Sequence, residues 1–380
     1  MGKDVIKIKK LFSMLCIFAL LLTGCQSKLP QQPVYGVAPA ESEAEIFING
    51  IPLKVYTAEE KEYLNMKEFA DAVGEKWQVS RGILVHQASI FHGDVPYFFT
   101  TDTLPPEEDN CSLYLCGGIY DGSSWYQQLE QVMSLYSYHL LEDPEKNCSY
   151  YTTYPTAEYL HTDYSVPTLM YHAVGDEPWG IRELFVSPAT LEEQLKYLTE
   201  NGYTPIWFED LGEVNQLQKP VLLTFDDGYD DNYTALLPLL KKYNVKATVF
   251  IIVDLLNTEH YLTSEQVKVL SESGLVSIQS HTMSHEFLST RSAEQLTYEL
   301  QQSKLALARI TGKEPFAVAY PSGRYSDASL AAVEQYYQFG LLSSGGTYVT
   351  GAKRSMIPRQ YVSRNTDLEE FVEMITTAEG

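Results

Sequence analysis

Val221-Leu222-Leu223-Thr224-Phe225-Asp226-Asp227-Gly228 is an apolar run that ends abruptly in two carboxylates and a glycine. The residues up to Phe225 predict a buried strand, and Gly228 tolerates the unusual backbone angles that end it. Successive strand side chains point to opposite faces, so Asp226 and Asp227 cannot do the same job from a regular strand. A bend at the strand end would aim both into one cleft, where each charge needs a cation, a proton or water.

The composition of the 380-residue chain, with 44% hydrophobic residues, predicts two folded domains. The formal net charge of −23 argues against a nucleic-acid partner, because a phosphate-binding surface needs a clustered basic face. We expect no nucleic-acid binding and a monomer. Of the later cysteines, Cys111 and Cys116 are close enough to pair across a turn or to stay free thiols, and Cys148 makes the number odd.

The N-terminus has the pattern of an export signal. A lysine-rich start precedes an apolar segment at 11–22, and Leu22-Thr23-Gly24-Cys25 follows. That tetrad resembles a bacterial lipobox, which implies a signal peptide at 1–24, cleavage before Cys25 and a lipid anchor on Cys25. The alternative is an uncleaved membrane anchor, for which the apolar run is short. We therefore expect a flexible linker at 25–43 and a protein tethered to the extracytoplasmic face of the bacterial cell membrane.

Residues 44–155 predict a small α+β domain. Strands flank an Asn49-Gly50 turn, and apolar residues recur at helical spacing over 64–73 and 125–138, so that hairpin and helix are repeated. Through Ile48-Asn49-Gly50 and the stretch Leu64-Asn65-Met66-Lys67-Glu68-Phe69-Ala70, this region resembles the copper-amine-oxidase-like, or stalk, domains of bacterial surface proteins. It contains no catalytic constellation.

Residues 166–380 predict an α/β domain, because buried strands alternate with amphipathic helices. That order indicates a parallel sheet, wound open or closed into a barrel, and about seven repeats favour the barrel. The expected strands include 166–171, 221–225, 246–253, 276–280, 316–320, 339–343 and 359–362, and the expected helices include 189–201, 231–243, 264–273, 293–311, 327–336 and 368–376.

Four polar clusters follow strands of this domain, where functional groups gather in such folds. His281 and His285, four residues apart across a short turn, can combine with one carboxylate as a His-His-Asp metal site with open positions. Zinc is our first choice, and cobalt, nickel or iron also suit these ligands. Such a metal lowers the pKa of a bound water towards roughly 7 and polarises a carbonyl, which suits amide or ester hydrolysis. One aspartate can then ligate while its neighbour acts as base, and His172 is the remaining strand-end histidine for the acid.

Thr224-Phe225-Asp226-Asp227-Gly228 and His281-Thr282-x-x-His285 resemble the first two motifs of the polysaccharide deacetylases of carbohydrate esterase family four, the NodB-homology domain. The resemblance spans about 166–376. It implies a distorted (β/α)7-type barrel, Asp226 as catalytic base, and Asp227, His281 and His285 as metal ligands.

The chain departs from this family pattern at two places. Ala319-Tyr320-Pro321-Ser322-Gly323 stands where many members have Arg-x-Pro-Tyr-Gly, so the arginine that steadies the catalytic aspartate is missing, and Arg324, Arg359 or Arg364 are candidates to replace it. Ser322, with Tyr320 and Arg359, is the expected oxyanion or substrate contact, through the Ser322 backbone N–H. The usual C-terminal Leu-x-His is absent too. Leu169-Met170-Tyr171-His172 is instead similar to the permuted poly-N-acetylglucosamine deacetylases, which implies His172 as the acid.

These features predict a metal-dependent hydrolase that removes N-acetyl groups from an N-acetylglucosamine-containing cell-surface polysaccharide or peptidoglycan. Two alternatives stay open: a non-catalytic glycan-binding lipoprotein on a deacetylase fold, motivated by the missing arginine, and an O-acetyl esterase acting on a wall polymer. Acetate release from different glycans separates the three.

Overall fold

A computed structural model describes residues 37–81, 86–92, 95–100, 114–115, 118–121, 123–136, 138–154 and 162–376. The expected lipid anchor Cys25 and the cysteines Cys111 and Cys116 lie outside these residues. The chain divides into two compact units, one formed by residues 1–38 with 77–125 and the other by residues 39–76 with 126–380. Within the described residues, no helix has both the length and the apolar character needed to cross a bilayer.

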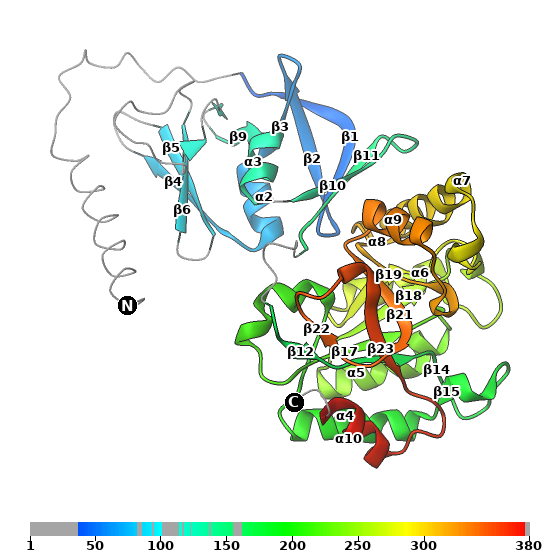
Figure 1. Ribbon diagram of the computed structural model, residues 1–380. Coiled ribbons are helices and arrows are strands. Elements are labelled where there is room, and N and C mark those ends of the chain that lie inside the picture. The colour runs from blue at the N-terminus through cyan, green and yellow to red at the C-terminus, as the bar shows by residue number, and fades with distance from the viewer. Residues whose placement is uncertain are drawn as a thin grey trace, which may run out of the picture. The chain divides into compact units, whose positions relative to one another are not determined.

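The larger unit contains a closed barrel of parallel strands (Figure 1). The hydrogen-bonded order is β13-β23-β21-β20-β19-β18-β17, and β17 pairs back to β13, which closes a ring of seven. The prediction of a (β/α)7-type barrel is thus confirmed. The barrel strands are β13 (Thr168–Tyr171), β17 (Pro220–Phe225), β18 (Ala247–Ile251), β19 (Val276–Ser280), β20 (Ala317–Ala319), β21 (Phe339–Gly345) and β23 (Ile357–Tyr361), with β16 (Thr204–Ile206) on the outer edge of β17.

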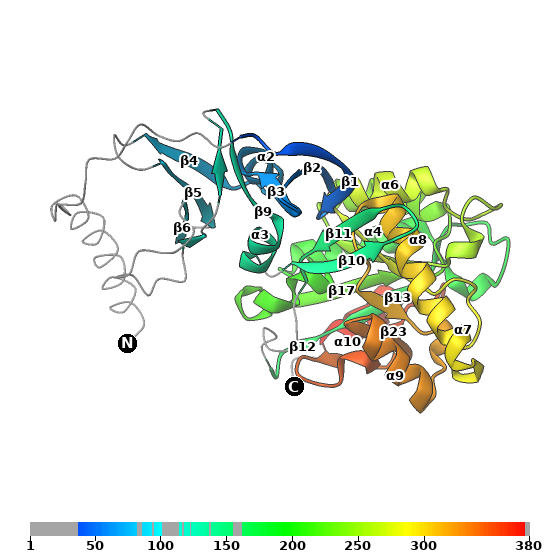
Figure 2. The same cartoon turned by 90° about the horizontal axis from the view of Figure 1, so that it is seen from above.

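Helices surround this ring, and α7, α8 and α9 lie together along one side of it in both views (Figures 1 and 2). The helices are α4 (Pro188–Glu200), η4 (Asn232–Leu236) with α5 (Leu237–Tyr243), α6 (Ser264–Glu272), α7 (Ala293–Thr297) with η7 (Tyr298–Gln302) and α8 (Ser303–Thr311), α9 (Asp327–Tyr336) and α10 (Leu368–Thr376). The 3-10 turns are η2 (Arg182–Leu184), η3 (Phe208–Gln216), η5 (Val253–Leu255), η6 (Leu288–Thr290), η8 (Pro321–Gly323) and η9 (Arg354–Met356). Two short strand pairs complete this part, β12 (Ser165–Val166) with β22 (Tyr348–Val349) and β14 (Ala173–Val174) with β15 (Phe185–Val186).

Strand alternation builds two apolar layers in this barrel. Leu222 packs with Phe250 and Phe339 in one cluster. Its neighbour Leu223 packs in another cluster, which contains Leu195 and other residues of the surrounding helices. Both faces of β17 are therefore buried, which explains its continuous apolar sequence.

A second sheet of the larger unit has the strand order β10-β11-β1-β2-β3-β9. Its strands are β1 (Ala40–Ile48), β2 (Ile51–Ala58), β3 (Lys61–Asn65), β9 (Trp125–Gln128), β10 (His139–Asp143) and β11 (Cys148–Thr152), and its helices are α2 (Met66–Val73) and α3 (Leu129–Leu135). The other unit contains β5 (His86–His92), β6 (Val95–Thr100), β7 (Tyr114–Leu115), β8 (Ile119–Tyr120) and most of β4 (Lys76–Arg81).

The predicted Asn49-Gly50 turn is confirmed, with φ of 47° and 89° in the left-handed region that such a hairpin needs. The helix expected at 64–73 is confirmed as α2 from Met66 onward, whereas Leu64 and Asn65 belong to β3. The prediction of a helix from residue 125 is wrong over its first turn. Residues 125–128 form β9, whose backbone pairs antiparallel with β3, and the helical apolar period begins only at Leu129.

The sheet that contains β10 and β11 packs against the C-terminal end of α8. Arg309 of α8 donates to both carboxylate oxygens of the buried Asp143, at 2.5 and 2.7 Å. At the end of α8, a Cβ added to Gly312 would lie 2.9 Å from the Cα of Gly50, so the two chain segments approach as closely as glycine permits. Cys148 is a buried free thiol that packs against Ala308.

Candidate functional site

The carboxyl ends of β17, β19 and β20 bring the predicted polar residues to one end of the barrel. Asp226 and Asp227 directly follow β17, and His281 directly follows β19. Asp227 has φ of 75° and Gly228 has φ of 77°, so the chain turns sharply after Asp226. A positive φ is unfavourable for an aspartate and is concentrated at functional sites. The strand-end bend expected from the sequence is present.

Asp227, His281 and His285 form a candidate metal site. Their potential ligand atoms all lie within 4.8 Å of one another. Asp227 Oδ1 is 3.4 Å from His281 Nε2 and 3.7 Å from His285 Nε2. Ligands 2.0–2.2 Å from a tetrahedral zinc stand about 3.4 Å apart, so these separations fit a metal of that size.

The surroundings orient these ligands as a metal requires. His281 Nδ1 lies 2.9 Å from the carbonyl oxygen of Ala319, which accepts the Nδ1–H and directs Nε2 toward Asp227, so that Nε2 would be the ligand atom for a bound metal. Burial lowers the pKa of His281, but the hydrogen bond and charge of Asp227 and the charge of Asp226 outweigh it and raise that pKa. The donor set, two imidazoles and one carboxylate, suits zinc and similar divalent metals.

The turn between the two histidines is held by Glu299, a residue that the sequence motifs do not single out. Its carboxylate accepts hydrogen bonds from the backbone N–H groups of Met283 and Ser284, both at 3.0 Å. Thr282 Oγ1 accepts from the His285 N–H at 3.1 Å. Thr282 and His285 have φ of 70° and 61°, and these bonds stabilise that strained turn.

Asp226 is paired with Arg359. The guanidinium donates to both carboxylate oxygens at 2.7 and 2.6 Å, and it also donates to Thr224 Oγ1 and to the Leu342 carbonyl. Burial raises the pKa of Asp226, but the Arg359 charge and the nearby His281 overcome this and hold the pKa below its ordinary value. The Asp226 carboxylate is therefore ionised at neutral pH despite being buried.

Asp227 is also ionised, because His281 and the other imidazoles outweigh the effect of burial and lower its pKa. Its environment thus differs from that of Asp226. Asp226 faces an arginine, and Asp227 faces two imidazoles. This asymmetry is suited to one carboxylate that takes a proton and one that binds a cation.

His172 follows β13 in the same cluster of charges. Asn232 Nδ2 donates to its carbonyl oxygen at 3.1 Å, and the Tyr361 ring packs edge-on against its imidazole at 5.8 Å. Nδ1 is buried and has no hydrogen-bond partner in the described part of the chain. Burial lowers the pKa of His172, while Asp226 and Asp227 act to raise it.

The three residues expected to contact the oxyanion or the substrate, Ser322, Tyr320 and Arg359, lie in different environments. Ser322 lies in the η8 turn after β20 with φ of 55°. The Tyr320 side chain is buried, and its hydroxyl donates to the Ser355 carbonyl at 2.9 Å, so the phenol faces the core rather than a substrate. Arg359 is likewise buried against Asp226 and turned away from solvent. Of the other arginine candidates, Arg324 lies over the Phe287 ring, and Arg364 donates to the backbone carbonyls of Gly175 after β14 and of Phe185 in β15.

The fold and the site together are those of a parallel (β/α) barrel protein with a candidate metal centre at the carboxyl ends of its strands. The family described as polysaccharide deacetylase matches residues 213–338. The structure of Streptococcus pyogenes deacetylase PplD in complex with acetate is similar, with 30% sequence identity and a TM-score of 0.53 over 56% of this chain and 99% of that one. This chain belongs to the polysaccharide deacetylase family.

Other relatives extend the comparison. BC0361, a polysaccharide deacetylase from Bacillus cereus, is 26% identical with a TM-score of 0.54, covering 80% of this chain and 99% of BC0361. Residues 162–376 alone cannot supply that share, so the similarity extends into the N-terminal region.

Curated relatives are matched over part of their length. YxkH of Bacillus subtilis strain 168 is 36% identical over 187 residues, which cover 48% of this chain and 65% of YxkH. The poly-beta-1,6-N-acetyl-D-glucosamine N-deacetylase of Escherichia coli K12 is 27% identical over 263 residues, 56% of this chain and 38% of the relative. The chain thus spans less than two thirds of each.

Proposed function

We propose that this protein is a metal-dependent deacetylase that removes N-acetyl groups from an N-acetylglucosamine-containing cell-surface polysaccharide or peptidoglycan. The observation that carries the proposal is the pair of adjacent carboxylates, one held by Arg359 and the other facing His281 and His285. Relatives named as deacetylases of poly-beta-1,6-N-acetyl-D-glucosamine and of peptidoglycan support this substrate class.

In this proposal Asp227, His281 and His285 hold a divalent metal, with zinc as the first candidate. When bound, the metal would acidify water and polarise the acetamide carbonyl. Asp226 accepts a proton from the attacking water, and Arg359 keeps that carboxylate ionised and in a fixed orientation. The Ser322 backbone N–H stabilises the developing oxyanion. His172 donates the proton that the leaving amine needs.

The paired Asp226 favours catalysis over the binding-only alternative. A decayed site would leave a buried carboxylate without its cation, which costs several kcal/mol, whereas here both carboxylate oxygens are bonded. The O-acetyl esterase alternative uses the same groups and differs only in the bond cleaved.

The test is acetate release from N-acetylglucosamine oligosaccharides, peptidoglycan and an O-acetylated glycan by the wild type and by Asp226→Asn. We expect release from an N-acetylated substrate and at least a roughly 100-fold loss in Asp226→Asn. Release only from the O-acetylated glycan would establish the esterase. Metal binding without acetate release from any substrate would establish the binding protein.

We also propose that the chain is anchored by lipid at Cys25 on the extracytoplasmic side and that the N-terminal α+β region is a stalk-like spacer. The lipobox-like Leu22-Thr23-Gly24-Cys25 supports the anchor. Labelled palmitate should enter the wild type and not Cys25→Ser when each is expressed in bacteria. Equal labelling of both would contradict the anchor.

A further inference from the structure

Trp179 lies in the loop between β14 and β15 and is 40% exposed, although its ring is held by four aromatic side chains. His260 stacks flat on the indole, with ring centroids 4.2 Å apart and planes inclined by 9°. The other three contacts are edge-on, and they come from Phe185 at 5.7 Å, Tyr229 at 5.1 Å and Tyr261 at 6.0 Å. These four ring contacts fix the position of Trp179 more firmly than is usual for an exposed side chain.

This aromatic cluster is attached to the candidate metal site. Tyr229 is two residues after the ligand Asp227 and is buried beneath Trp179. The loop that carries His260 is tied to the same turn, because the Leu262 N–H donates to the Gly228 carbonyl at 3.0 Å and the Asp230 N–H donates to the His260 carbonyl at 2.9 Å. The indole therefore keeps a fixed place relative to the metal ligands.

The loop that carries Trp179 is fixed at both ends by Arg364. The guanidinium donates to the carbonyl oxygens of Gly175, Asp176 and Phe185. Arg364 also donates its backbone N–H to the Glu183 carbonyl at 3.0 Å. A ring held in this way loses little conformational entropy when a ligand covers it, which is the condition for a preorganised binding surface.

A packing role alone does not account for Trp179. The small apolar cluster of Ala173, Phe185 and Tyr229 is already buried, and the Trp179 residue as a whole remains 40% exposed. Pyranose rings have an apolar C–H face that packs on the flat surface of an aromatic ring, and tryptophan gives the largest such surface. Exposed aromatic side chains beside a few polar groups are typical of binding sites.

We propose that Trp179, backed by His260, is a sugar-binding platform on which a pyranose ring stacks when the neighbouring N-acetylated residue of the same glycan chain occupies the metal site. The platform makes the enzyme prefer a chain over an isolated acetyl group. This inference rests on the proposed deacetylase function and assigns a subsite to it.

The test compares Trp179→Ala, Trp179→Phe and the wild type on an N-acetylglucosamine pentasaccharide and on 4-nitrophenyl acetate. The pentasaccharide is used in β-1,4- and β-1,6-linked forms. The ester carries no sugar ring that could stack on Trp179. We expect the ratio of kcat/KM for the pentasaccharide to kcat/KM for the ester to fall about 10-fold in Trp179→Ala, mainly through KM, and less in Trp179→Phe. Ile181→Ala is the matched control, because Ile181 is 66% exposed in the same loop and should leave the ratio unchanged.

A second measurement does not depend on turnover. In the Asp226→Asn background, the pentasaccharide should bind with about 10-fold lower affinity when Trp179 is also changed to alanine, as measured by calorimetry. An unchanged ratio and unchanged affinity in Trp179→Ala would overturn the platform, as would equal losses on both substrates. Absence of acetate release from any glycan by the wild type would instead overturn the proposed function.

Discussion

Arg359 donates two parallel hydrogen bonds to the Asp226 carboxylate, at 2.7 and 2.6 Å, and the two residues are only 1% and 2% exposed. The family motif places an arginine just before the turn at residues 320–323, where this chain has Ala319. Arg359 reaches the aspartate from β23 instead, so a cation is supplied from a different strand of the same barrel. A buried ion pair of this geometry fixes the carboxylate and keeps it charged.

Arg359→Lys should lower kcat/KM for acetate release about 10- to 100-fold, because lysine keeps a charge but cannot bond both carboxylate oxygens in parallel. Arg359→Met should lower kcat/KM further than Arg359→Lys does. It should also lower the free energy of unfolding by about 3–5 kcal/mol, since it leaves Asp226 buried without a cation. Acetate release and urea unfolding measure the two effects.

Arg354→Lys is the control, because Arg354 donates to Gln338 and does not contact the site. Wild-type activity in both Arg359→Lys and Arg359→Met would mean that Asp226 does not need this cation.

Site residues that lie close together in the sequence could be predicted from it. Site residues that reach the site only through long-range contacts could not. Asp226 and Asp227 follow a recognisable strand, and His281 and His285 share one turn, so spacing alone brings them together. Arg359 is 133 residues from its partner, and nothing near it distinguishes it from Arg324 or Arg364. Its place in the short strand expected at 359–362 is the only sequence signal for a position in the barrel.

Glu299 and β9 escape prediction for related reasons. Glu299 lies inside a helical stretch, where a carboxylate is ordinarily a solvated side chain, and only folding brings it under the histidine turn. Residues 125–128 resemble the start of a helix because apolar residues continue at helical spacing after them, but pairing with β3 decides their conformation.

Removal of the metal should abolish acetate release, and added zinc should restore it. His281→Ala should lose zinc binding in calorimetry, and it should also lose the thermal stabilisation by zinc, which at 100 times the dissociation constant amounts to about 2.7 kcal/mol. His139→Ala is the matched control, since His139 lies in β10 and stacks on Tyr154 outside the site. Full activity after exhaustive chelation would contradict metal dependence.

Gly323→Ala should damage the turn that holds Ser322. A Cβ at residue 323 would lie 2.1 Å from Ser343 Oγ and 2.9 Å from the Ser343 backbone nitrogen, so the turn must move. A displacement of about 1 Å at a catalytic group can cost roughly 100-fold in rate, and we expect a loss of that order in kcat.

Gly274→Ala separates this clash from backbone strain. Gly274 has φ of 71°, close to the 65° of Gly323, but a Cβ there meets no atom within 4 Å. Both variants should lose about 1 kcal/mol of stability from the positive φ, Gly323→Ala should lose more because of its clash with Ser343, and only Gly323→Ala should lose activity. Equal kcat values in the two would remove the η8 turn from the proposed mechanism.

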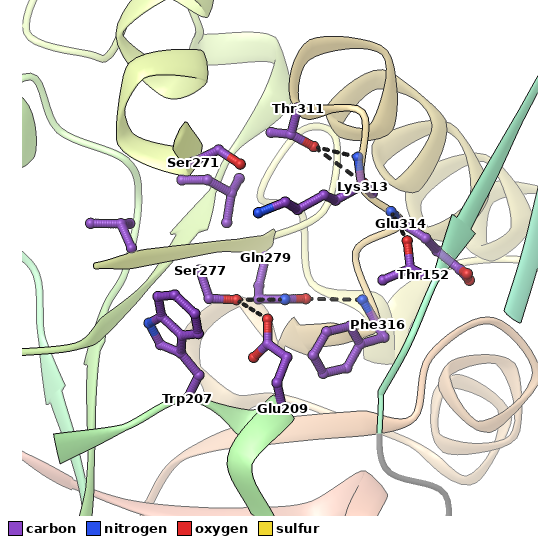
Figure 3. A pocket seen from close by; sticks show the side chains of 12 residues that line it. Thr152, Trp207, Glu209, Ser271, Ser277, Gln279, Thr311, Lys313, Glu314 and Phe316 are labelled. Carbon is purple, nitrogen blue, oxygen red and sulfur yellow. Dashed lines mark hydrogen bonds between the residues drawn. The ribbon is translucent and has the colours of Figure 1, made fainter. Parts of the chain in front are cut away.

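Glu209 should make the protein less stable as the pH rises from about 4 to about 7. It lines a cavity of about 30 Å³ with Ser277 and Gln279. Its carboxylate accepts a hydrogen bond of 2.8 Å from the Ser277 hydroxyl, and this bond is drawn in Figure 3. Its other oxygen, Oε2, is buried without a hydrogen-bond partner in the described residues. Burial raises the pKa of Glu209 from 4.5 to about 6.

Because the pKa is higher in the folded state, the protonated carboxyl stabilises the fold fully below pH 4.5, and this contribution is lost as the pH rises through about 6. Glu209→Gln keeps an acceptor for Ser277 and cannot ionise, so above about pH 7 it should be more stable than the wild type by up to about 2 kcal/mol, with no difference at about pH 4. Urea unfolding at a series of pH values measures this. Glu213→Gln, which changes an exposed carboxylate of the same segment, should follow the wild type at every pH. A Glu209→Gln curve parallel to the wild type across this range would show that the cavity admits enough water to solvate the charge.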